Sequence, residues 1–262
     1  MKPDISEFSY GYAITDELIH WRGTAITASP IFPSLYQEGQ AGGGYDVMLS
    51  RPGLPLFLQF KLSDYMVRKN AHEAQLCKIS VPYYRMKLRS KRYSQQHEML
   101  LELENLGQEV YYSAPAFHKQ TELNKYYFSH QIRDKSIWIR PSFVGPLPDN
   151  NDHSLSFRLS GPIMFCSEPR EIQCKGTFEE FSFSVKSAFR EKCEQAIGQD
   201  ALKKLSSLIV DILKKHTDIF HGNRKSFLGE IQSKSQIEQI ALYSNYFLNC
   251  HFFIVHQQED SG

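Results

Sequence analysis

The sequence lacks the features that mark several common classes of protein. It contains no Cys-x-x-Cys pair, and its five cysteines are scattered at Cys77, Cys166, Cys174, Cys193 and Cys250. This pattern supports neither a disulfide framework nor a structural zinc site. No apolar run approaches the ~18 residues of a membrane helix, and the N-terminus has no signal-peptide core. We therefore expect a cytoplasmic protein without a membrane segment.

Several familiar catalytic motifs are also missing. The sequence has no P-loop, no dinucleotide-binding fingerprint and no Gly-x-Ser-x-Gly turn. His97, His118 and His153 lack metal-ligand spacing, so a core or surface role is the better interpretation. The net charge of +1 gives no overall attraction for nucleic acid, and any basic surface must be local.

What is present indicates a globular chain of mixed structure. A length of 262 residues, 41% of them hydrophobic and 23% charged, suits one large domain or a domain with an appendage. We predict an α/β (α+β) domain over residues 1–170, with a mixed central sheet flanked by helices. Apolar stripes at helical spacing predict a mostly helical region over 177–262, with helices at 200–216 and 235–248 and a last strand at 251–256.

The stretch Gly42–Lys61 organises the first region. Two short apolar runs, Tyr45–Leu49 and Leu56–Leu62, flank a break rich in Pro and Gly, which predicts a hairpin. Asp46 lies in the first run. Because strand side chains alternate, Gln59 and Lys61 share one face of the second run. One sheet could thus bring together an acid, an amide oxygen and an ammonium group. The alternative is that Asp46 is a turn residue and Lys61 a strand-end lysine that reaches solvent.

A further carboxylate is expected in the first helix. Ile14, Leu18 and Trp21 form a helical stripe, and Glu17 falls on the same inward side. A carboxylate on a buried side should have a partner. The alternative is that Glu17 lies at the edge of the stripe and is solvated.

Cations alternate with other residues between 83 and 93. In an extended segment they would form a row along one edge, as required to hold a phosphate backbone. The alternatives are an edge strand protected by charge or a solvated loop. The candidate nucleic-acid-binding residues are Arg85, Lys87, Arg89, Lys91 and Arg92.

Together these pieces resemble the PD-(D/E)xK restriction-endonuclease-like core, and most closely its Mrr-like branch. In that branch Gly-x-Asp is followed by Gln-x-Lys, here Gly44-Tyr45-Asp46 and Gln59-Phe60-Lys61. Glu17 lies in the first helix, as in the family. The resemblance covers about residues 8–115, and it implies a restriction-endonuclease-like fold.

The resemblance also implies a chemistry. Asp46 would be the principal ligand of Mg²⁺ (or Mn²⁺), with Glu17 as a second carboxylate and Gln59 as a neutral oxygen ligand. The metal would offset the phosphate charge and acidify a bound water. Lys61 would orient that water and stabilise charge that develops on the phosphate. The product in the family is a cut strand of duplex DNA.

Two functions are compatible with the sequence. The first is a metal-dependent DNA endonuclease of bacterial restriction or anti-phage defence, as the resemblance suggests, assembled as a homodimer because both strands must be cut. The second is a catalytically silent module of the same fold that binds nucleic acid or a protein partner. The helices of the C-terminal region would serve dimerisation or partner docking.

Overall fold

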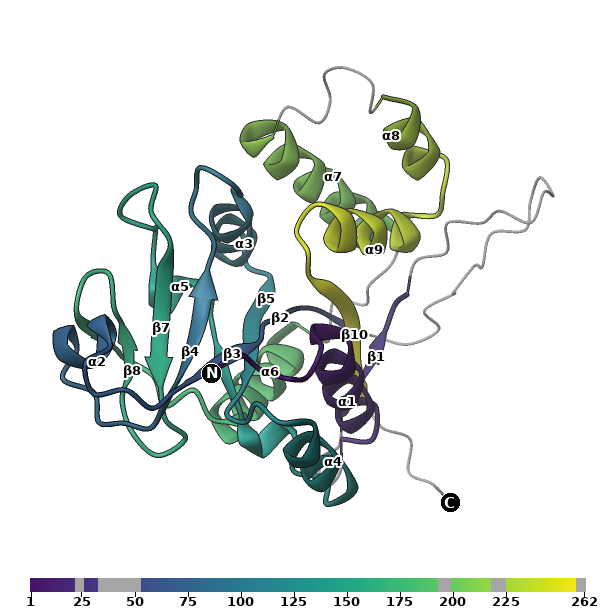
Figure 1. Ribbon diagram of the computed structural model, residues 1–262. Coiled ribbons are helices and arrows are strands. Elements are labelled where there is room, and N and C mark those ends of the chain that lie inside the picture. The colour runs from purple at the N-terminus through teal and green to yellow at the C-terminus, as the bar shows by residue number, and fades with distance from the viewer. Residues whose placement is uncertain (22–25, 33–52, 193–198, 218–224, 258–262) are drawn as a thin grey trace.

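The computed structural model describes residues 1–21, 26–32, 53–192, 199–217 and 225–257. In this part of the chain the strands form two sheets with helices beside them (Figure 1). The first sheet has the order β1-β10-β2-β5-β6; its β2–β5 pair is parallel and its other pairs are antiparallel. Its strands are β1 (Ile26–Pro30), β2 (Leu54–Phe60), β5 (Glu109–Pro115), β6 (Ser136–Ile139) and β10 (His251–Gln257).

The second sheet is antiparallel throughout, in the order β3-β4-β7-β8-β9. It follows directly on the first, because Lys61 and Leu62 alone separate β2 from β3. Its strands are β3 (Ser63–Met66), β4 (Tyr83–Leu88), β7 (His153–Phe157), β8 (Ile163–Phe165) and β9 (Arg170–Ile172).

The helices cover both faces of the first sheet and build two hydrophobic clusters. On one face lie α1 (Glu7–Ile19), α4 (Gln120–Phe128) and α6 (Phe178–Lys192), which pack with residues such as Leu58 and Phe60. The other face contributes Phe57 to a cluster that also takes in the second sheet. The helices of that cluster are α3 (Gln96–Asn105), α5 (Pro141–Val144), α7 (Gln199–His216), α8 (Lys225–Gln232) and α9 (Gln236–Tyr246). Two short helices, α2 (His72–Leu76) and η1 (Arg133–Lys135), complete the described elements.

Strand β2 is buried on both faces because it lies at the centre of the first sheet. Residues Leu56–Phe60 are all buried, as expected of a strand in a parallel pair covered by helices. The alternation predicted from the sequence is confirmed, since Leu58 and Phe60 join one cluster and Phe57 the other.

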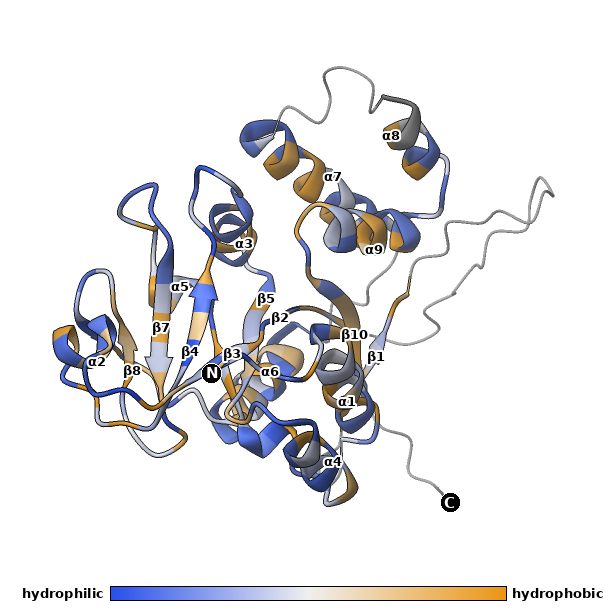
Figure 2. Cartoon of the chain, in the orientation of Figure 1, coloured by the Kyte–Doolittle hydropathy of each residue, from blue (hydrophilic) through white to orange (hydrophobic). Residues whose placement is uncertain are grey.

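Strand β10 links the helical C-terminal region to this sheet. It lies between β1 and β2, and Leu58 pairs with His251 on one side while Phe60 pairs with Ser113 of β5 on the other. Both edges of β2 are therefore occupied by distant parts of the chain, and not by the hairpin partner expected from the sequence. The predicted Tyr45–Leu49 strand lies outside the described residues. Figure 2 shows apolar residues running through β10 and along α7.

The α/β class and the helical C-terminal region are confirmed, but the second sheet was not predicted. The stripe expected in α7 is buried as proposed, including Leu205, Ile209 and Leu213. The division of the chain into 1–170 and 177–262 stays a prediction. Helix α6 and strand β10, both from the second part, contact the first sheet. Among the described helices, none is both long enough and apolar enough to span a membrane.

Candidate reaction centre at the end of β2

Lys61 lies at the carboxyl end of the parallel β2–β5 pair. Its backbone N–H donates to the Ser113 carbonyl (2.9 Å), which extends the pairing by one residue. Its Nζ donates to Oε1 of Gln96 (3.3 Å), the first residue of α3. The carboxyl ends of parallel strands form a shared edge where ligands often bind. The lysine therefore occupies a position in the fold that suits a functional group.

The charge of Lys61 is poorly compensated. Burial lowers the pKa of its ammonium group to about 8; Glu7 offsets part of this shift by raising the pKa, and Arg89 lowers it to a smaller extent. The hydrogen-bond partner of Nζ in the described part of the chain is a neutral amide. Desolvation of a cation without a close anion disfavours its charged form. An anionic ligand at this point would restore the missing compensation.

Glu7 is the carboxylate whose charge acts on Lys61. It is the first residue of α1, directly after the N-cap Ser6. Burial raises the pKa of Glu7, whereas the charges of Lys61 and Arg89 lower it. Glu7, Lys61 and Arg89 therefore act on one another electrostatically, and we call these three residues the charged centre.

The start of α1 is fixed against the end of β2. Tyr10 is fully buried, and its hydroxyl lies 2.7 Å from the Ser113 hydroxyl of β5. At Gly11 an added Cβ would lie 2.7 Å from the Phe60 ring. The helix thus approaches β2 more closely than a side chain at Gly11 would allow, and this contact places Glu7 near the strand end.

Glu17 lies elsewhere, contrary to what the sequence suggested. It is ten residues from Glu7 along α1, a distance of about 15 Å at 1.5 Å per residue. Its carboxylate accepts hydrogen bonds from the backbone N–H groups of Ile132 (2.9 Å) and Arg133 (3.1 Å). Glu17 is buried, and this burial raises its pKa. The expected buried partner exists, but it is the backbone at the start of η1, and not the charged centre.

A small cavity of about 140 Å³ adjoins Glu17, and it is lined also by Asp16, His20, His130 and Arg133. The Arg133 guanidinium lies over the Phe178 ring at 4.8 Å and has Nε 3.9 Å from Glu17. These contacts indicate that Glu17 holds the segment after α4 against α1.

Gln59 shares the face of Lys61, as predicted, but its amide group also has a structural contact. It is fully buried, and its Nε2 donates to the Asn249 carbonyl (3.3 Å). Gln96 similarly donates from Nε2 to the Leu248 carbonyl (2.6 Å). Asn249 has a φ of 47°, a turn conformation between α9 and β10 that these two amides help to hold. The Oε1 atom of Gln59 is buried and has no hydrogen-bond partner among the described residues.

Some of the ligands that a hard cation prefers are present at this end of β2. Mg²⁺ is commonly held by one or two carboxylates with waters and phosphate oxygens. The described residues near Lys61 offer the Glu7 carboxylate on the α1 side of β2 and, on the opposite face, the buried and partnerless Oε1 of Gln59. They contain no group of three His, Cys, Asp or Glu side chains able to hold a metal. Asp46, the principal ligand implied by the resemblance, lies outside the described residues.

The predicted row of cations is divided by ion pairs. Arg85 lies in β4 and binds two carboxylates, Glu73 (2.5 Å) and Asp64 (2.9 Å). Lys87 in the same strand also reaches Asp64 (3.1 Å). These two cations are therefore neutralised within the second sheet, as in the charge-protected strand that was the alternative interpretation.

The remaining three cations lie beyond the end of β4. Lys91 pairs with Glu98 (3.3 Å), and the Arg92 guanidinium lies 5.7 Å from the centre of the Tyr93 ring. Arg89 is exposed and belongs to the charged centre. Of the five predicted residues, Arg89 alone acts electrostatically on Lys61.

Sequence reasoning therefore missed Glu7 and Gln96. An acidic residue in the first helical turn is common because it complements the helix dipole, so Glu7 carries no special signal. The Gln96 contact depends on how α3 packs against β5, the neighbour of β2, which residue spacing does not reveal.

No family model matches the chain, and no curated protein or solved structure matches it at a significant level.

Proposed function

We propose that the chain is a metal-dependent nuclease that hydrolyses phosphodiester bonds in DNA, with its reaction centre at the carboxyl end of β2. The observation that carries the proposal is Lys61, a half-buried residue whose ammonium pKa is lowered to about 8 and which has a neutral amide as its hydrogen-bond partner. Strongly perturbed groups of this kind cluster at functional sites. A phosphodiester is the anion that the Gln-x-Lys resemblance implies.

The residues have distinct roles in this proposal. Lys61 binds a non-bridging phosphate oxygen and stabilises the charge that grows there during attack by water. Arg89, exposed beside it, binds a neighbouring phosphate and positions the strand. Because Lys61 loses its proton above about pH 8, phosphate binding through this group weakens at higher pH.

A divalent cation completes the proposed chemistry. Mg²⁺ or Mn²⁺ supplies charge neutralisation and a more acidic bound water. Glu7 would be the described carboxylate that holds it, with Asp46 added from the resemblance. The resemblance also implies Gln59 as a ligand, but its Oε1 is buried on the face of β2 opposite α1. Glu7 thus takes the place that the sequence had assigned to Glu17.

The wider biological setting follows from the resemblance. Duplex cleavage needs a reaction centre for each strand, and we therefore include a homodimer in the proposal. A role in bacterial restriction or anti-phage defence, in the cytoplasm, is part of the same proposal, as is a partner docked on the C-terminal helices.

Cleavage of supercoiled plasmid DNA with Mg²⁺ or Mn²⁺ tests this proposal. We expect nicked or linear DNA from the native chain and a loss of about 100-fold or more in rate for Lys61→Met and for Glu7→Gln. Lys69→Met is the matched control, because Lys69 is exposed and is not one of the charges that shift the pKa of Lys61. Cleavage by Lys61→Met at the native rate would contradict the proposal.

A silent binding module is the second candidate, favoured by one observation. The amides of Gln59 and Gln96 both donate to carbonyls of the α9–β10 turn, so both residues have a structural role that requires no catalysis. This candidate predicts DNA binding that weakens as salt rises, without cleavage in either metal. Weaker binding by Arg89→Ala than by Lys69→Ala would then locate the binding surface.

A further inference from the structure

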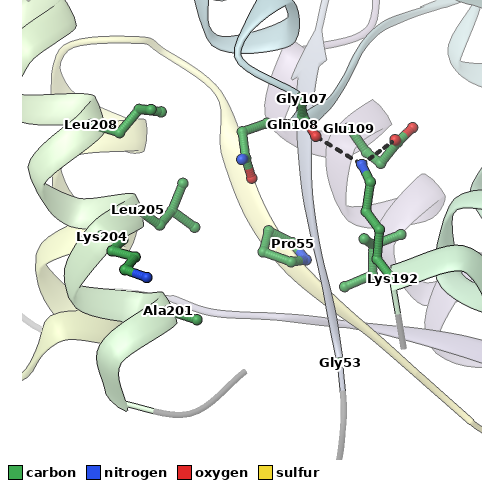
Figure 3. Close-up of a pocket in the computed structure, with 11 residues that line it drawn as sticks. Gly53, Pro55, Gly107, Gln108, Glu109, Lys192, Ala201, Lys204, Leu205 and Leu208 are labelled. Carbon is green, nitrogen blue, oxygen red and sulfur yellow. Dashed lines mark hydrogen bonds and ion pairs between the residues drawn. The ribbon is translucent and has the colours of Figure 1, made fainter. Parts of the chain in front are cut away.

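A second candidate site lies at the opposite end of β2. A cavity of about 270 Å³ is lined by the start of β2 at Gly53–Pro55, by the turn before β5 at Gly107–Glu109, by Lys192 of α6 and by α7 (Figure 3). Strand β2 has seven residues, so this cavity is about 20 Å from Lys61 at 3.3 Å per residue. It is therefore separate from the proposed reaction centre.

The cavity has an apolar wall on each side. Leu54 and Pro55 come from β2, and Leu205 and Leu208 come from the facing side of α7. Leu54 and Leu205 are buried, and Leu208 is half-buried. Ligand sites typically combine such apolar walls with a few placed polar groups.

The charged residues around the cavity differ in whether they have an ion-pair partner. Glu109, its acidic residue, is bound by Arg140 and by Nζ of Lys192 (3.2 Å). Lys192 also donates to the Gly107 carbonyl (2.8 Å), as Figure 3 shows. Lys204 reaches the cavity from α7, is exposed, and forms no ion pair within the described part of the chain. Among the described residues, one positive charge thus remains without an ion-pair partner beside an apolar surface.

We propose that this cavity binds a small monocarboxylate with an apolar body, of the size of a medium-chain fatty acid. The carboxylate would pair with Lys204, and the hydrocarbon would lie between the leucines of β2 and α7. A cavity of 270 Å³ is near the lower end of the range for small-molecule sites, about 300–1,000 Å³, which excludes larger lipids. A single uncompensated ammonium group matches a single carboxylate.

Octanoate is a suitable probe, and octan-1-ol is its neutral counterpart. Titration of the full chain is followed by ¹H–¹⁵N NMR, with shifts expected around residues 53–55, 107–109 and 201–208. We expect octanoate to bind at least tenfold more tightly than octan-1-ol. If the shifts do not saturate by about 10 mM octanoate, the binding free energy is weaker than about −3 kcal/mol, and the proposal is overturned.

Two pairs of variants on α7 make the test specific. Lys204→Ala should weaken octanoate binding about tenfold, whereas Lys203→Ala, the neighbouring exposed lysine outside the cavity lining, should leave it unchanged. Ala201→Trp should block the cavity, whereas Ser207→Trp, on the exposed surface of the same helix, should not. Equal effects within either pair would mean general surface adsorption and would overturn the proposal. DNA cleavage does not enter this measurement, so its outcome is independent of the proposed nuclease function.

Discussion

Lys61 and Arg85 are both cations that the sequence predicted to be functional, yet they differ in how the surrounding residues compensate their charge. Arg85, in the second sheet, binds two carboxylates and its ion pairs are satisfied within the fold. Lys61, at the end of the first sheet, has a neutral amide partner and a lowered pKa. A compensated cation stabilises the fold, whereas an uncompensated one costs stability and remains available to an anion. The difference separates a structural ion pair from a candidate reaction centre.

The largest stability effect that this comparison predicts is for Arg85→Met. Removing the guanidinium leaves Asp64 and Glu73 without their shared partner, and both carboxylates are largely buried. We expect a loss of about 2–3 kcal/mol in the free energy of unfolding, measured with urea. Lys87→Met is the control, because Lys87 is 61% exposed and its pair with Asp64 should contribute less than about 1 kcal/mol. Similar losses in the two variants would remove the distinction.

Glu17→Ala should have a somewhat smaller effect. It leaves the backbone N–H groups of Ile132 and Arg133 without their acceptor in a buried place, which we expect to cost about 2 kcal/mol in urea unfolding. Asp16→Ala, at the adjacent and less buried position, should cost about half as much or less. DNA cleavage per folded molecule should persist in Glu17→Ala, and its loss would return Glu17 to the reaction centre.

The smallest effect has the opposite sign. Lys61→Met should stabilise the chain by on the order of 1 kcal/mol at pH 7, because it removes a desolvated charge. The pKa of Lys61 is about 8 when folded and ordinarily 10.5, so the unfolded state binds more protons between these values. The native chain therefore gains stability, relative to Lys61→Met, as pH rises from about 8 to 10.5. Unfolding measured across this range checks the trend, and an advantage of Lys61→Met that grows with pH would contradict it.

Much of the fold was predictable because local patterns encode it. The apolar stripe of α7 and the alternation along β2 both follow from residue spacing. The place of β10 between β1 and β2 was not predictable in this way. Strand order depends on contacts between segments some 200 residues apart, and the pattern of His251–His256 indicates a strand without naming its neighbours.

The candidate site was predictable in part for the same reason. Gln59 and Lys61 share a face because alternation within one strand is a local property. Glu17 was assigned to the centre because it lay on the inward side of its helix, but inward-facing residues along a helix contact different partners over its length. The position of Glu7 near Lys61 follows only from the packing of α1 against Phe60 and Ser113.

The most direct test of this account is the titration of Lys61 itself. NMR of the chain with ¹³C-labelled lysine, assigned by comparison with Lys61→Met, follows the ε-carbon from pH 6 to 11. The account predicts a midpoint near 8 for Lys61 and a rise in that midpoint when an oligonucleotide is added, since a bound phosphate favours the charged form. A midpoint near 10.5 that DNA does not change would contradict it, because Lys61 would then be an ordinary solvated lysine.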